Sequence, residues 1–299
     1  MDSTAWLVSG LLPAAIAAIS CLIASFLVGG RGGDDDPRSN RWHHATICLG
    51  LGWVVAVVAA LYGQRIVAAE ESSFWWSDEF WHRGFWGVLA AGLLLGTTTR
   101  ASVRDSPLRW VIAGLIAIVT AAISLPVGDG WDDALPLHRG WAALLASGCL
   151  AGFFALDRLA NSKADRWFPL VVLAALAGPM FVAATTYGAI AQWTLSALAA
   201  TAVSAGFALA GRLPSAIAVA IGYPAIALAT VINAAGRFYS FEEHPWWSYA
   251  LLIAVAPTVA GVDWAFRIRS AWLRAFVAAV VSIALIAVSV AVQLSSDAP

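Results

Sequence analysis

Three segments combine histidine, carboxylate and tryptophan side chains, which can bind a metal ion or anchor a helix end at a membrane surface. They lie at residues 64–84, 128–140 and 237–247, and each contains one histidine. Imidazole and carboxylate groups suit Zn, Fe or Mn, whereas clustered tryptophan is typical of the membrane–water interface. The sequence leaves two interpretations open, interfacial anchors with a solvated acidic rim or convergent loops that bind a divalent cation. The candidate metal ligands are His82, His138, His244, Asp78, Asp132 and Asp133.

Two of these segments share a longer pattern that suggests an anion contact or a local ion pair. In both, an arginine stands five residues before a Glu-Glu pair, and a Trp-Trp-Ser sequence follows. An ion pair of this kind holds the loop and contributes little stability where it is exposed. The alternative is that the two arginines contact an anionic substrate. The residues concerned are Arg65, Glu70, Glu71, Arg237, Glu242 and Glu243.

Residues 74–78 (Phe-Trp-Trp-Ser-Asp) add a third interpretation of the same loops. This segment is similar to the Trp-rich external motif of the haem-handling cytochrome c assembly proteins, which pair it with external histidines. The similarity covers a short stretch, and the spacing of Trp and Gly differs from that family. It implies an extracytoplasmic haem-handling role.

Prolines inside apolar runs mark a second group of candidate residues. Proline has no N–H, so a carbonyl of the preceding turn must be satisfied by neighbouring side chains, water or a ligand. Two interpretations follow: kinks that serve packing, or a substrate cavity among the runs 168–189, 214–234 and 248–266. The cavity candidates are Pro179, Tyr187, Tyr223, Pro224, Asn233, Pro257 and Thr258.

The elements that position these residues are predicted to be membrane-spanning helices. Of 299 residues, 61% are hydrophobic and 12% are charged, with a mean hydropathy of +0.78. Soluble domains carry roughly 25% charged residues, so a soluble protein is excluded. Segments in lipid must satisfy their own backbone hydrogen bonds, and no period-two alternation indicates a barrel. The ten predicted spans are 5–29, 43–63, 85–99, 109–127, 141–157, 168–189, 193–211, 214–234, 248–266 and 271–293.

Two details of this assignment depend on weaker signals. The runs 85–99 and 141–157 are short for a bilayer, which predicts tilted or partly embedded helices. The uncharged stretch 168–211 is too long for one span, and we predict a turn near Tyr187–Thr194.

The basic residues predict the orientation of the chain. Thirteen Lys and Arg residues fall at the loops on one side, and four, Arg65, Arg83, Arg139 and Arg237, fall on the other. By the positive-inside rule the richer side is cytoplasmic. The prediction is a multi-pass protein of the cytoplasmic (inner) membrane with both termini extracytoplasmic.

An internal duplication is the second architectural prediction. The Arg/Glu-Glu/Trp-Trp pattern recurs, and Arg104-x4-Arg109 recurs as Arg269-x4-Arg274. This predicts a parallel repeat of residues 1–127 and 193–299 around central helices 128–192, within one transmembrane domain, 1–299. In length and span number the chain is similar to the drug/metabolite transporter superfamily, but that family has inverted five-span repeats and cytoplasmic termini.

Charged residues within the spans are few and lie near their ends. Asp157 and Asp263 have Arg158 and Arg267 within one turn, and we predict snorkelling or pairing rather than proton transfer. The absence of a mid-membrane carboxylate disfavours a proton-coupled pump. The three cysteines lie in apolar runs and indicate neither a disulfide framework nor a zinc site.

These features favour transport over catalysis. The sequence contains no nucleotide-binding, metalloprotease or serine-hydrolase signature and no basic patch for nucleic acid. The prediction is a transporter or channel-like permease for a small molecule or ion, embedded in the lipid bilayer, with no cofactor identified. The alternatives are an extracytoplasmic metal-, haem- or lipid-handling protein and an accessory subunit that binds partner subunits.

Overall fold

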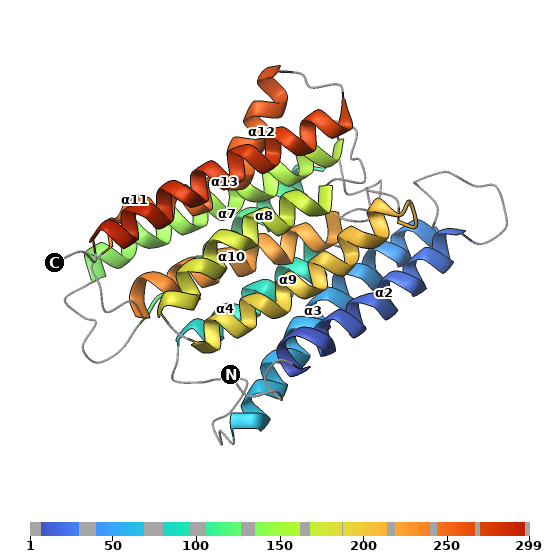
Figure 1. Ribbon diagram of the computed structural model, residues 1–299, viewed down its shortest axis with the longest axis horizontal. Helices are drawn as coiled ribbons and strands as arrows, with labels where there is room; N and C mark the ends of the chain where they lie inside the picture. Colours follow the sequence, from blue (N-terminus) through green and yellow to red (C-terminus); the bar gives the residue numbers. More distant parts are fainter. Residues whose placement is uncertain are drawn as a thin grey trace.

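The structure, a computed structural model, is an all-helical bundle. It describes residues 7–29, 40–68, 80–95, 106–126, 135–161, 168–186, 188–213, 219–239, 244–266 and 270–296. Every regular element in these ranges is a helix, and most helices lie side by side along a common direction (Figure 1). The prediction of an all-α protein is therefore confirmed.

The helices follow the apolar runs of the sequence. The first part of the chain forms η1 (Leu7–Leu11), α2 (Leu12–Gly29), α3 (Asn40–Ala68), α4 (Phe80–Ala90), η2 (Ala91–Leu95) and α6 (Pro107–Ile123). The second part forms α7 (Leu135–Asn161), α8 (Phe168–Thr186), α9 (Gly188–Leu209), α10 (Val219–Tyr239), α11 (Trp246–Ile253), α12 (Val255–Phe266) and α13 (Ala271–Ser296).

Several pairs of neighbouring helices pack antiparallel. On α4, Gly84 lies against Ser124 and Gly87 lies against Thr120, so the contact moves back along α6 as α4 advances. At the other end of the chain, the Ser289 hydroxyl of α13 donates to the Ser248 carbonyl at the start of α11, at 2.9 Å. Glycine at such contacts lets two helices approach closely. Close packing of this kind is common between helices in lipid, where the hydrophobic effect does not drive their association.

Helix α10 is the centre of the bundle. Every residue from Ala220 to Gly236 is buried, and α10 contacts α3, α4, α6, α7, α8 and α9. Its buried surface carries three polar side chains, Tyr223, Thr230 and Asn233. A helix that is apolar and buried on all sides cannot be the lipid-facing wall, so the polar groups of α10 belong to the protein interior.

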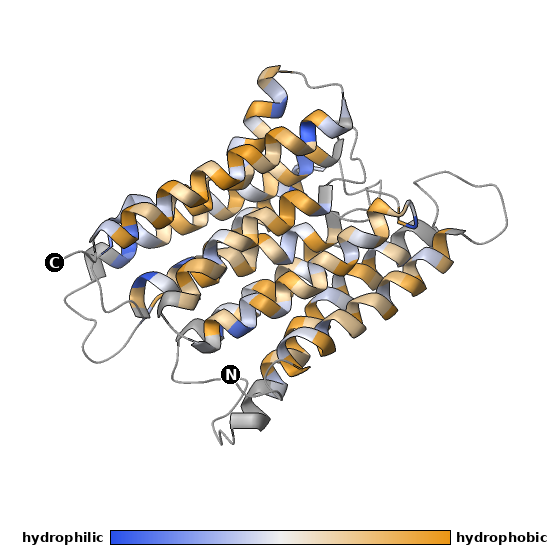
Figure 2. Cartoon of the chain, in the orientation of Figure 1, coloured by the Kyte–Doolittle hydropathy of each residue, from blue (hydrophilic) through white to orange (hydrophobic). Residues whose placement is uncertain are grey.

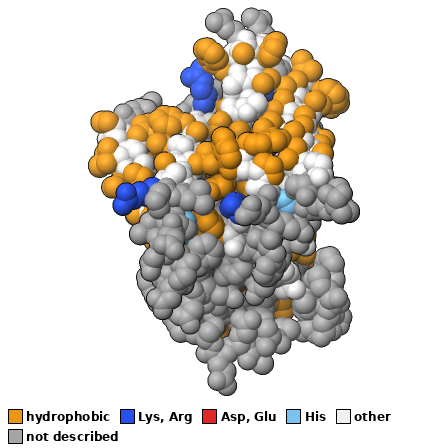
Figure 3. Space-filling model, turned by 90° about the vertical axis from the view of Figure 1, so that its left-hand side faces the viewer, with side chains coloured by type: hydrophobic (Ala, Val, Ile, Leu, Met, Phe, Trp, Pro, Cys, Tyr) orange, Lys and Arg blue, Asp and Glu red, His pale blue; other side chains and the backbone are white. Residues whose placement is uncertain are grey.

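The outer helices have the surface of a membrane protein. Five helices in the described ranges are long and apolar enough to cross a membrane, or six if the bent pair α11 and α12 is one span. Apolar residues cover the helix bodies, and hydrophilic residues gather near the helix ends (Figure 2). Large apolar side chains on α2 and α13 face outward, Phe26 at 82% exposure and Ile283 at 65%. In the end-on view, the described side chains are mostly hydrophobic, with a few basic and histidine side chains (Figure 3).

The helix boundaries agree with the predicted spans in several places. Helix α13 begins at Ala271, and in the uncharged stretch α8 ends at Thr186 and α9 begins at Gly188, at the near edge of the predicted turn. The predicted short span 141–157 is wrong in length, because α7 extends from Leu135 to Asn161 and supplies a 22-residue apolar segment. The run 85–99 is short as predicted, with apolar helix over Arg83–Leu95.

The prolines break one span and leave two intact. Pro179 and Pro224 lie inside the continuous helices α8 and α10. The span at 248–266 is bent by 52° between α11 and α12, at Ala254, three residues before Pro257. Of the three predicted break points, only this one interrupts a helix.

Candidate functional site

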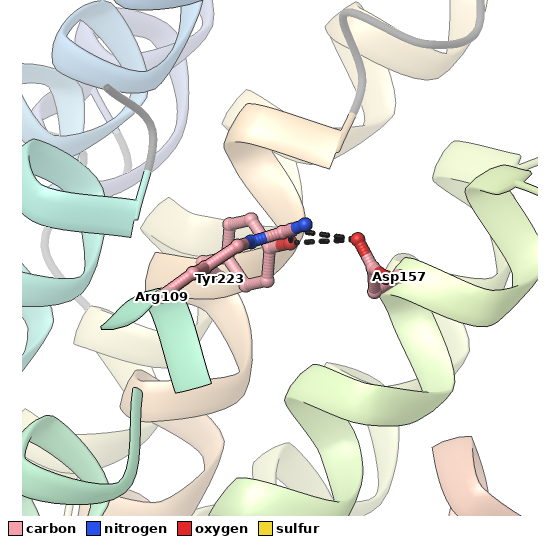
Figure 4. Close-up of polar contacts among 3 residues, drawn as sticks. All are labelled: Arg109, Asp157 and Tyr223. Atoms are coloured by element: carbon pink, nitrogen blue, oxygen red, sulfur yellow. Dashed lines mark hydrogen bonds and ion pairs between the residues drawn. The ribbon is translucent and has the colours of Figure 1, made fainter. Parts of the chain in front are cut away.

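A buried polar cluster joins three helices at one end of the bundle. Arg109 of α6 forms an ion pair with Asp157 of α7, with 2.6 Å between Arg109 Nη2 and Asp157 Oδ1. Arg109 Nη2 also donates to the hydroxyl oxygen of Tyr223, from the central helix α10. The Tyr223 hydroxyl in turn donates to Asp157 Oδ1 at 3.5 Å, which closes the cluster (Figure 4).

Local sequence places Arg109 inside the bundle. Ser106 caps α6, its hydroxyl accepting from the Leu108 N–H at 3.3 Å, and Pro107 begins the helix. This Ser-Pro start sets Arg109 in the first turn of α6, where its side chain is 4% exposed. The predicted span began at Arg109, and the structure begins α6 two residues earlier and buries the Arg109 side chain.

The helix macrodipole disfavours both charges of the pair. Arg109 is near the positive N-terminal end of α6, and Asp157 is in the last turns of α7, near the negative end. The side chain of Asp157 is 17% exposed. Neither charge is stabilised by its own helix, so the contacts with each other and with Tyr223 contribute to stabilising both.

Aromatic side chains enclose the cluster. The Phe153 ring meets the Tyr223 ring edge-on, with centroids 5.6 Å apart. The Arg109 guanidinium lies 5.3 Å from the Trp110 ring centroid, and Trp110 stacks on Phe154 at 3.7 Å. Apolar walls of this kind lower the local dielectric and strengthen the ion pair relative to an exposed one.

A groove of about 800 Å³ opens beside the cluster, between α6, α7 and α12. Asp157 and Arg158 contribute charge to its lining, and Pro257 lies on its α12 wall. Apolar and aromatic side chains form most of the lining, with few polar groups, which is typical of sites for small organic molecules. Its remaining lining residues are Trp110, Ala151, Phe154, Ala155, Ala260, Gly261 and Trp264.

A second buried ion pair joins the last two helices. Asp263 of α12 lies 2.8 Å from Arg274 of α13, measured from Oδ1 to Nε, and both side chains are largely buried. Pairing of both aspartates is confirmed, and each ion pair joins residues of two different helices. Asp157 pairs across helices with Arg109, and Arg158 is exposed. Arg267 lies outside the described residues.

The structure brings one of the predicted cavity residues, Asn233, to a small internal void, and two of the predicted prolines lie one turn beyond residues that line it. A void of about 20 Å³ lies between α7, α8, α10 and the break between α11 and α12, and Asn233 and Thr230 line it. Pro179 and Pro257 each stand four residues after a lining residue, Ala175 and Ile253. Tyr223 belongs to the Arg109 cluster instead, Pro224 and Thr258 line neither space, and Tyr187 lies outside the described residues.

The loop candidates are described only in part. His138 is 6% exposed and packs edge-on against Phe238, with ring centroids 5.3 Å apart, and His244 is also 6% exposed. Arg237 lies over the Trp141 and Phe238 rings, 5.9 Å from each centroid. No group of three metal-ligating His, Cys, Asp or Glu side chains occurs in the described ranges.

The other predicted residues of these loops remain predictions. Arg65 and His82 lie in α3 and α4, but their side chains are not among those described. The carboxylates Glu70, Glu71, Asp78, Asp132, Asp133, Glu242 and Glu243 lie outside the described residues.

Comparison with protein families, curated proteins and solved structures finds no match to this chain.

Proposed function

We propose that this chain is a membrane transport protein for a small organic molecule, and that the Arg109–Asp157–Tyr223 cluster closes one end of its pathway. The observation that supports this most directly is the buried cluster itself. Charged side chains are costly inside a membrane-embedded bundle, and they are retained chiefly along substrate and ion pathways. The cluster joins α6 and α7 to the central helix, so its breakage frees three helices to move apart at that end.

The neighbouring groove supports the substrate class. Its walls carry Trp110, Phe154 and Trp264, whose faces suit an apolar body, and Arg158 adds a positive charge. Asp157, which also lines the groove, is neutralised by Arg109. A small molecule with an apolar part and an anionic group fits these walls better than a bare inorganic ion does.

The transport proposal predicts that the centre of the bundle becomes accessible from the end that carries the cluster. In a background without Cys21, Cys48 and Cys149, an Ala229→Cys substitution places a thiol beside the central void. Adding Asp157→Asn breaks the ion pair. If Asp157→Asn shifts the equilibrium between the closed and the open bundle by about 1.4 kcal/mol, the labelling rate at position 229 rises tenfold. The measurement is labelling by a small membrane-impermeant thiosulfonate applied to right-side-out and inverted vesicles.

A matched variant controls for general loosening of the bundle. Asp263→Asn breaks the other buried pair, which joins α12 only to α13, and it should leave labelling at position 229 unchanged. If the thiol at position 229 reacts from neither side in the parent protein or in Asp157→Asn, the bundle is static. That result rejects transport and favours an accessory subunit.

We also propose that all ten helical segments cross the membrane, with both termini extracytoplasmic. The agreement of the ten apolar runs with the helical segments supports this count. On this count the Arg109 cluster lies at the end with thirteen basic residues, which is the cytoplasmic end by the positive-inside rule. We further propose that residues 1–127 and 193–299 form a parallel repeat. Arg109 and Arg274, which correspond in that alignment, both open a helix and both pair with an aspartate.

The orientation predicts the outcome of reporter fusions. A reporter that is active only outside the cytoplasm should be active when fused after Pro299 and inactive when fused after Leu213. The physical reason is that the strong basic bias holds one set of loops in the cytoplasm. Activity after Leu213 together with inactivity after Pro299 would show that the chain is inserted in the opposite sense.

A further inference from the structure

We propose that the void between α7, α8, α10 and the α11–α12 break binds one Na⁺ ion. The void measures about 20 Å³, which is room for a single water-sized guest. It lies beside the fully buried helix α10 and is distinct from the groove next to Arg109. This proposal goes beyond the transport proposal and does not depend on what the groove binds.

Two side chains of α10 present oxygen atoms at the void with their donors already used. Asn233 is 1% exposed, and its amide N–H donates to the Ala229 carbonyl at 2.8 Å. Its Oδ1 atom is buried and has no hydrogen-bond partner among the described residues. The Thr230 hydroxyl donates to the Ile226 carbonyl at 3.0 Å and is also hydrogen-bonded to the Cys149 thiol, which leaves one lone pair of its oxygen for a guest.

Two prolines release backbone oxygens at residues that line the same void. Pro179 follows Ala175 by four residues in α8, and Pro257 follows Ile253 by four residues across the helix break. Because proline has no N–H, the carbonyls of Ala175 and Ile253 lose their usual helical donors. These prolines, far apart in the sequence, therefore affect one place in the fold.

The break between α11 and α12 leaves the last carbonyls of α11 beside the void. Helix α11 ends at Ile253, a lining residue, and the chain bends by 52° before α12 begins. The partial negative charge at the end of α11 is offset by the partial positive charge at the start of α12, so the break contributes carbonyl oxygens without helical donors rather than a net field, and such oxygens coordinate cations in the broken helices of other membrane proteins.

The combination favours a monovalent cation over water. A water molecule can donate only two hydrogen bonds, whereas the polar groups identified at this void are all acceptors. A cation can interact with all of them. No charged side chain is among the nine residues that line the void, and a neutral shell of oxygens does not offset the desolvation of a divalent ion. The small volume favours Na⁺ over the larger K⁺.

The test is equilibrium binding of ²²Na⁺ to the full chain in nanodiscs, with choline as the replacement cation. We expect saturable binding of one ion per chain, displaced by unlabelled Na⁺ and more weakly by K⁺. Asn233→Leu and Thr230→Val each remove one ligand oxygen at nearly constant volume, and the affinity should fall by about tenfold or more. Asn233→Asp supplies a carboxylate and should raise the affinity.

Thr194→Val is the matched control. Thr194 is buried on α9 and donates to the carbonyl four residues earlier, at 2.9 Å, as Thr230 does on α10, but it does not line the void. This variant should bind Na⁺ as the parent protein does. A gain of affinity in Asn233→Asp cannot arise from misfolding, so it separates a lost ligand from a damaged fold.

Two results would overturn the proposal. One is the absence of saturable ²²Na⁺ binding to correctly folded protein, which would mean that the void holds water only. The other is unchanged affinity in both Asn233→Leu and Thr230→Val. Because binding is measured without transport, a chain that binds Na⁺ but fails the thiol-labelling test keeps the cation site and loses the transport function. A chain that passes the thiol-labelling test but does not bind Na⁺ keeps the transport function and loses the cation site.

Discussion

Replacing Arg109 by methionine is expected to lower the free energy of unfolding by about 3–5 kcal/mol, the usual effect of removing one partner from a buried ion pair. The substitution leaves the Asp157 carboxylate without its counter-charge and removes the donor to the Tyr223 hydroxyl. Methionine keeps most of the volume of arginine, so the loss reports the charge rather than a cavity. The measurement is the unfolding free energy of the purified protein in lipid, obtained by steric trapping.

A second substitution separates the pair from the surrounding packing. When Asp157→Leu is added to Arg109→Met, no uncompensated charge remains, and most of the stability should return. Arg158→Met, at the exposed neighbouring position, should change the unfolding free energy by no more than about 0.5 kcal/mol. If the double variant is as unstable as Arg109→Met, the charge pair is not what holds these helices together.

Replacing Gly87 by alanine is expected to cost about 1–3 kcal/mol through overpacking of α4 against α6. A methyl group at this position would overlap the side chain of Thr120, which is fully buried and branched at Cβ. Three atoms of Thr120, Oγ1, Cβ and Cγ2, lie within the overlapping region. Because the branched side chain has few alternative rotamers, the helices must move apart to admit the methyl group.

The control for this change lies on α6 itself. A methyl group at Gly114 meets no atom within 4 Å, so Gly114→Ala should be neutral or slightly stabilising. Adding Thr120→Ala to Gly87→Ala removes two of the three overlapping atoms and should recover part of the loss. Equal effects of Gly87→Ala and Gly114→Ala in thermal unfolding would contradict the close contact between α4 and α6.

The sequence was sufficient to predict the helices but not their neighbours. Apolar runs reveal segments that avoid water, so α13 and the separation of α8 from α9 were predicted from composition alone. The pairing of Arg109 with Asp157 joins residues 48 positions apart, and local patterns do not report which helices touch. One local signal was available: Ser106-Pro107 is a typical helix start, and it places Arg109 inside α6 rather than in a loop.

For the void as well, individual residues could be predicted from the sequence but their arrangement in space could not. Pro179, Pro257 and Asn233 were identified from the sequence because proline and amide groups are unusual in apolar runs. Only Asn233 of the three lines the void, and the residues one turn before the two prolines line it as well. This arrangement depends on the packing of α8, α10 and α11, which no single apolar run specifies. The bend at Ala254 was likewise expected near Pro257, but its position depends on the contacts of both half-helices.

The central place of α10 has a consequence for how this protein is made. The chain leaves the ribosome from its N-terminus, so helices α2 to α9 are synthesised before the helix around which they pack. Until Tyr239 has emerged, the surfaces of α3, α4, α7 and α8 that contact α10 face lipid or one another, and Arg109 lacks its contact with Tyr223. A chain that stops before Val219 therefore lacks the central helix and is not a smaller stable domain. We expect cellular quality control to degrade such a truncated chain.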